Sequence, residues 1–101
     1  MEKDLVVGLG EIGLPIFKLF SKHNVVEGID KNPKLNRTLP SLENHNISIM
    51  HICIPFTKSF LNEIKKLVKK FNPRLIVIHS TISPHTTEKL QRILDIPVIY
   101  S

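Results

Sequence analysis

The sequence predicts an α/β fold in which one parallel sheet of about five strands carries helices on both faces. Two observations support this prediction. Short, β-rich apolar runs alternate along the chain with stretches of helical periodicity, and a glycine-rich turn joins the first run to the first helix. Because right-handed crossovers connect parallel strands, this alternation implies a sheet covered by helices on both sides.

The first strand is expected at 4–8, where the apolar side chains are typical of a parallel strand that is covered on both faces. A helix should follow from about Glu11 to His23. Pro15 is compatible with this helix because the N–H groups of a first helical turn have no partner within the helix. The buried side of the helix is predicted to carry Ile12, Ile16, Phe17, Leu19 and Phe20.

A G-x-G-x-x-G pattern at Gly8, Gly10 and Gly13 joins this strand to this helix. In a dinucleotide-binding turn the first glycine allows the turn, the second lets a pyrophosphate approach the backbone, and the third lets helix and strand pack closely. The pyrophosphate would lie at the helix N-terminus, where N–H groups and the helix dipole favour an anion. Glu11 and Ile12 lie inside the pattern and belong to the same predicted site.

Asp30 ends the second predicted strand, at 25–30. A carboxylate there can accept hydrogen bonds from the adenosine ribose, and it disfavours a 2′-phosphate by charge repulsion. Lys31, Lys34 and Arg37 could offset that repulsion if they turn inward, but on balance NAD is favoured over NADP as the cofactor. The alternative is a plain strand–turn–helix, in which the glycines serve packing alone and Asp30 caps the next segment.

The later elements are less regular in their spacing. A polar segment with two prolines separates the second strand from a third at 47–54, and we expect one short helix or irregular crossover near 34–44. The sheet should therefore lack one strand of the fuller Rossmann topology, making the fold a shortened Rossmann-like, doubly wound sheet. A helix is predicted at 60–71, capped by Thr57 or Ser59, and a strand at 74–80. A shorter helix should start at Thr86 or Thr87, with Leu90, Ile93 and Leu94 facing the sheet. The last strand is predicted at 97–100.

Polar residues follow the carboxyl ends of the predicted strands, at the edge where open α/β sheets bind ligands. Pro55 and Thr57 follow the third strand, and Ser80 and Thr81 follow the fourth. The hydroxyls of Thr57, Ser80 and Thr81 could contact the phosphates, ribose or nicotinamide of a cofactor. The alternative is that they only cap helices and form turns.

Composition limits the classes of partner and location. The 101 residues correspond to one domain, and 14 Lys and Arg against 9 Asp and Glu give a formal net charge of +5. A nucleic-acid partner is not expected, because no aromatic platform interleaves the lysines of the 60–71 helix, which we interpret as a solvated face. No apolar run approaches the roughly 20 residues that span a bilayer, and we find no signal-peptide pattern. The single Cys53 excludes an internal disulfide and agrees with a cytoplasmic location.

Three blocks occur in order along the chain: V-G-L-G-E-I-G-L-P at 7–15, I-C-I-P at 52–55 and S-T-I-S-P-H-T-T at 80–87. They resemble the V-G-L-G-x-V-G-L-P, I-C-V-P and S-T-V-P-P-G-T-T motifs of the N-terminal NAD-binding domain of the UDP-glucose/GDP-mannose dehydrogenase family. The resemblance covers nearly the whole chain in outline, and the third block is more specific than the glycines. It implies that the ADP half of NAD lies on Gly8, Gly10, Gly13 and Asp30, with Pro55, Ser80 and Thr81 near the ribose and nicotinamide.

The chain also departs from the family pattern. His85 stands where the family usually has glycine, Ser83 where it often has proline, and Phe56 where a threonine is common. The segment after Asp30 is shorter than usual. The sequence ends at 97–101, about where the family's first domain gives way to its central helix and sugar-nucleotide domain.

The catalytic cysteine of that family and its supporting lysine, asparagine and acid come mostly from the other half of the enzyme. Cys53 is not expected to replace that cysteine, because a thiol inside a buried strand does not readily form a thiolate. The histidines show no metal-ligand spacing, so no metal site is predicted. No catalytic residue is therefore assigned in this chain.

The expected function is that of an NAD(H)-binding domain which presents the nicotinamide, while a partner chain, a second domain or another copy of the chain supplies substrate and acid–base groups. A stand-alone, non-catalytic nucleotide-binding or sensor module is the first alternative. A basic interaction domain that has lost cofactor binding is the second.

Overall fold

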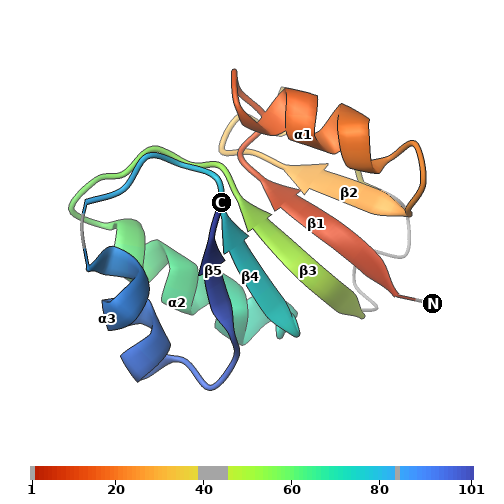
Figure 1. The fold of residues 1–101 in the computed structure, drawn as a ribbon. Coiled ribbons are helices and arrows are strands. Elements are labelled where there is room, and N and C mark those ends of the chain that lie inside the picture. The colour runs from red at the N-terminus through yellow and green to blue at the C-terminus, as the bar shows by residue number, and fades with distance from the viewer. Residues whose placement is uncertain (1, 39–45, 84) are drawn as a thin grey trace.

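A computed structural model describes residues 2–38, 46–83 and 85–101, which form a five-stranded sheet with all neighbouring strands parallel. The strands run in the order β2-β1-β3-β4-β5 (Figure 1). The predicted α/β class is therefore confirmed, and the sheet is that of a small Rossmann-like, doubly wound fold. The strand bounds are β1 (Lys3–Val7), β2 (Val26–Ile29), β3 (Ile47–Ile52), β4 (Leu75–Ile78) and β5 (Val98–Tyr100).

Helices cover both faces of the sheet. The helix α1 (Gly13–Phe20) lies beside β1 and β2, whereas α2 (Phe60–Phe71) and α3 (Thr86–Ile93) lie on the opposite face (Figure 1). In the part of the chain that the structure describes, no helix is both long and apolar enough to cross a bilayer.

Alternate residues of β1 contribute to two hydrophobic cores. Leu5 and Val7 belong to the larger core, which includes buried residues of α2 and α3 such as Phe60 and Leu90. Val6 belongs to the smaller core, which packs against Ile16, Phe17 and Phe20 of α1. This burial on both faces explains why the first strand has almost no polar position after Asp4.

The helix α1 is shorter than the predicted 11–23, and two of its predicted core residues are exposed. Ile12 precedes the helix and is 44 % exposed, and Leu19 is 56 % exposed. An eight-residue helix presents one narrow stripe to the sheet, and Leu19 lies outside that stripe. For the same reason Ile93, predicted to face the sheet, is exposed at the end of α3.

The polar segment after β2 contains a 3₁₀-helix, η1 (Pro33–Leu35), which is capped by the side chain of Asn32. Arg37 then pairs antiparallel with Gly28 at the outer edge of β2. The short helix or crossover predicted near 34–44 thus coincides with η1 at its beginning, and its later part lies outside the described residues.

Buried and half-buried polar contacts link neighbouring strands. Lys3 of β1 forms an ion pair with Glu27 of β2, with 3.3 Å between Nζ and Oε2. On the other face, His51 lies with its Nε2 3.3 Å from Asp4 Oδ2 and its Nδ1 3.0 Å from His79 Nε2. Burial lowers the pKa of both histidines, and the neighbouring His51 lowers that of His79 further. Neutral imidazoles then satisfy the network: His79 donates to His51, which donates to Asp4.

Candidate functional site

In the sheet, β2 pairs with one edge of β1 and β3 pairs with the other edge. The strand order therefore reverses next to β1. Ligands of open α/β sheets bind at the carboxyl edge beside such a switch point. A cleft of about 990 Å³ opens there, between the glycine turn, the ends of β2, β3 and β4, and the middle of α2. Its size lies within the range of ligand pockets. The predicted site residues that line it are Gly8, Gly10, Glu11, Ile12, Asp30, Lys31, Pro55, Ser80 and Thr81.

The three glycines of the turn have different steric surroundings. Gly8 has a φ of +94°, and a Cβ on it would lie 2.8 Å from the carbonyl oxygen of Cys53. A Cβ on Gly13, at the start of α1, would lie 1.5 Å from the carbonyl oxygen of Gly8. A Cβ on Gly10 would meet no described atom within 4 Å. The turn and the close approach of α1 therefore require Gly8 and Gly13, whereas Gly10 borders open space in the cleft.

Asp30 connects the end of β2 with the glycine turn. One carboxylate oxygen accepts a hydrogen bond from the N–H of Leu9 at 2.7 Å, and the other accepts from the N–H of Asn32 at 2.9 Å. These two backbone donors hold the pKa of Asp30 below its usual value, so the group is ionised near neutral pH. Each oxygen has capacity for a further hydrogen bond, which a hydroxyl of a ligand in the cleft could donate.

The α2 side of the cleft was not anticipated from the sequence. Glu63, Lys66 and Leu67 line it, three residues at helical spacings of three and four that share one face of α2. Lys66 was expected only on a solvated face. A signal was available, because α2 is the helix that follows the carboxyl end of β3, and such a helix can border the ligand edge with one of its faces.

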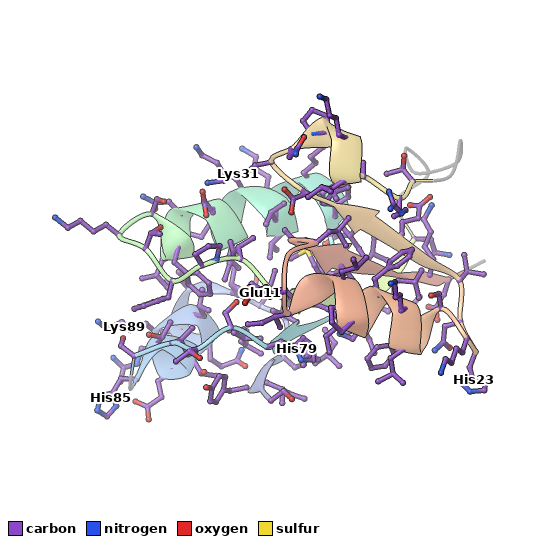
Figure 2. All side chains as sticks on the ribbon, turned by 90° about the horizontal axis from the view of Figure 1, so that it is seen from above. Glu11, His23, Lys31, His79, His85 and Lys89 are labelled. Atoms are coloured by element: carbon purple, nitrogen blue, oxygen red, sulfur yellow. The ribbon has the colours of Figure 1, made fainter. Side chains whose placement is uncertain are left out.

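An ion pair joins the segment that follows β2 to α2 at this cleft. The ammonium of Lys31 lies 3.0 Å from Oε1 of Glu63. In Figure 2, Lys31 lies on the side of α2 and Glu11 lies at the turn that precedes α1. Both walls of the cleft therefore carry charged side chains.

The predicted hydroxyl residues differ in their positions. Ser80 is buried, and its hydroxyl donates to the carbonyl oxygen of Ile54 at 2.5 Å, which ties β4 to the end of β3. Thr81 is exposed at the cleft. Thr57 does not line the cleft; it borders a separate hollow of about 540 Å³, and its hydroxyl lies 3.0 Å from that of Ser59. Neither Thr57 nor Ser59 caps α2 with its side chain in the way that the sequence predicted, since the Ser59 N-cap makes no such bond.

Cys53, predicted inside a buried strand, lies directly after β3, is half-buried and lines the cleft. Burial raises the pKa of the Cys53 thiol to about 12, so a thiolate does not form near neutral pH. Within residues 2–38, 46–83 and 85–101, no group of three or more His, Cys, Asp and Glu side chains is placed to hold a metal ion.

Comparisons of this chain with protein-family models, with curated proteins and with solved structures give no match.

Proposed function

We propose that this chain binds NAD(H) in the cleft at the carboxyl edge of the sheet. The ADP half would lie over the glycine turn and against Asp30, and the nicotinamide would extend toward Pro55, Ser80 and Thr81 at the ends of β3 and β4. Of the glycines in the turn, Gly8 and Gly13 have a packing reason and Gly10 has none. That difference carries the proposal, because a turn that served packing alone would not need a glycine at the cleft.

The helix terminus at the cleft favours an anion. Ile12, the N-cap of α1, forms no side-chain cap, and the first turn of the helix contains no acidic residue. The positive end of the helix dipole is then available to a pyrophosphate that approaches over Gly10. Asp30 supports the same binding mode, because its ionised carboxylate lines the cleft beside this turn.

The turn before α3 supports the family resemblance. His85, at the position where the family usually has glycine, adopts a φ of +70°, a conformation that glycine adopts most easily. The substitution thus changes the side chain and retains the left-handed backbone of the turn. We propose that the chain corresponds to the cofactor half of a nucleotide-sugar dehydrogenase, working in the cytoplasm.

The groups that bind the substrate and transfer protons would come from outside this cleft. Bound NAD would supply the hydride acceptor, and this chain's residues would bind and orient it. Since the Cys53 thiol is not ionised, substrate and acid–base groups would come from a partner chain, a second domain or a second copy. A stand-alone nucleotide sensor would share the cleft and lack turnover.

Isothermal titration with NAD, NADH, NADP and ADP-ribose tests the proposal, using the unaltered chain and Gly10→Ala. We expect NAD and ADP-ribose to bind the unaltered chain. Because the new methyl group would occupy the space for the pyrophosphate, Gly10→Ala should fold normally and bind at least about tenfold more weakly. Lys34→Met serves as the control, because Lys34 lies on η1 at the same edge and does not line the cleft. No binding of any nucleotide at millimolar concentration, or unchanged affinity in a folded Gly10→Ala, would contradict the proposal.

A further inference from the structure

We propose that Glu63 sets the preference of this cleft for NAD over NADP by engaging the ammonium group of Lys31. This inference rests on the proposed function, since it assigns the cofactor selectivity of the same site. Lys31 adjoins Asp30, the carboxylate expected at the adenosine ribose, so its side chain starts where a 2′-phosphate would lie. A basic residue at such a position can accept a 2′-phosphate if its charge is available.

The charge of Lys31 is engaged in this structure. Its Nζ lies 3.0 Å from Oε1 of Glu63, across the cleft on α2. The Glu63 side chain is the more fixed partner, because it is only 26 % exposed whereas that of Lys31 is 84 % exposed. The backbone of Glu63 is also held in the first turn of α2, where its N–H donates to the Ser59 carbonyl at 2.8 Å. Glu63 therefore determines where the exposed Lys31 ammonium lies.

The charged residues that line the cleft also favour NAD over NADP. Among the described residues that line it, Glu11, Asp30 and Glu63 are acidic, and Lys31 and Lys66 are basic. The acidic excess disfavours the additional dianion of a 2′-phosphate, and the Lys31–Glu63 pair leaves the Asp30 charge uncompensated.

The other cations of the β2 edge do not compensate for Asp30 there. Arg37 directs its guanidinium to the carbonyl oxygens of Leu35 and Asn36, at 3.3 and 3.4 Å, and neither Arg37 nor Lys34 lines the cleft. Lys66 lies on α2, three residues beyond Glu63 and on the same wall. Lys31 is thus the cation that can be released beside Asp30.

Four chains test the inference: the unaltered protein, Glu63→Gln, Lys31→Met and the double variant. The dissociation constants of NAD and NADP are measured for each by titration calorimetry at low ionic strength, and thermal unfolding is recorded to verify that each variant is folded. Glu63→Gln should tighten NADP binding about tenfold, which is the order expected for one released charge near a phosphate, and should change NAD binding less than about twofold. The double variant should lose this gain, because no ammonium remains at position 31. Lys34→Met is the matched control and should leave the NADP-to-NAD ratio unchanged.

The outcomes separate this inference from the proposed function. If the unaltered chain binds NAD and Glu63→Gln leaves the NADP-to-NAD ratio unchanged, the role of Glu63 is refuted while NAD binding stands. If the double variant keeps the full gain, the charge of Glu63 acts directly and the engagement of Lys31 is refuted. If neither dinucleotide binds any of the four chains, the proposed function fails and the inference fails with it.

Discussion

Alanine substitutions at Gly13 and Gly10 should change the free energy of unfolding by very different amounts. In Gly13→Ala the new Cβ would start 1.5 Å from the carbonyl oxygen of Gly8, whereas real Cβ contacts essentially never fall below 3.0 Å. The helix α1 must therefore move away from the turn by about 1.5 Å or the turn must open. Either movement separates Ile16, Phe17 and Phe20 from the smaller core. We expect a loss of at least about 4 kcal/mol, a large part of the roughly 5–15 kcal/mol typical of a domain.

In Gly10→Ala the methyl group enters open space, so the change in unfolding free energy should stay within about 1 kcal/mol. Urea unfolding followed by circular dichroism measures both variants. With a slope of about 2 kcal/mol per molar urea, Gly13→Ala should lower the midpoint by about 2 M and Gly10→Ala by less than about 0.5 M. A midpoint for Gly13→Ala within about 0.5 M of the unaltered chain would refute the close approach of α1 to the turn. Equal destabilisation by both substitutions would refute the distinction between packing and binding glycines.

Two further predictions concern His51, His79 and Cys53, whose pKa values are shifted by full or partial burial. Because the folded-state pKa values of His51 and His79 lie below the usual value of a histidine, the unfolded chain binds protons more readily, and the free energy of unfolding should fall as the pH drops from 7 through about 6.5 toward 5. Urea midpoints measured across this range should fall less steeply in His79→Gln, with a replacement of the exposed His23 as control, and an unchanged slope would contradict the neutral histidine network. The Cys53 thiol, with its pKa raised to about 12, should react with an aromatic disulfide reagent at pH 8 far more slowly in the folded chain than after unfolding in urea, and equally rapid reaction of the folded chain would contradict the raised pKa.

The sheet was predictable because its strands are covered on both faces. Apolar runs of strand length, separated by helical patterns, identified the parallel strands, and the structure confirms them. The limits and the buried side of α1 were less predictable. Leu19 fits the apolar pattern of the sequence, but its side chain is exposed in the structure. The buried pairs of Lys3 with Glu27 and of Asp4 with His51 could not be predicted, since they depend on the strand order and register of β1, β2 and β3.

One wall of the cleft could be predicted and the other could not. The residues of the glycine turn and of the strand ends lie at the carboxyl edge by the topology of a parallel sheet, so Asp30 and Thr81 line the cleft as expected. Glu63 and Lys66 line it because α2 packs against the sheet with one particular rotation about its axis. That rotation is fixed by Phe60, Ile64 and Phe71 in the larger core. Thr57 was predicted at the cleft for the same reason as Ser80, because each follows the carboxyl end of a strand. The chain after Pro55 instead places Thr57 at the second hollow.

Asp30, the acid that the sequence pattern emphasises, is a poor residue for testing cofactor binding by mutation. Its carboxylate accepts from the N–H of Leu9 inside the glycine turn and from the N–H of Asn32 before η1, so it holds the shape of the cleft as well as lining it. Asp30→Ala would leave both donors without this partner and would weaken a nucleotide even if no ribose hydroxyl ever contacted the carboxylate. Gly10→Ala and Glu63→Gln lack this ambiguity: a methyl group in open space and a neutral amide of the same shape leave the backbone of the turn in place. Loss of affinity in the first and changed selectivity in the second can therefore be assigned to the ligand.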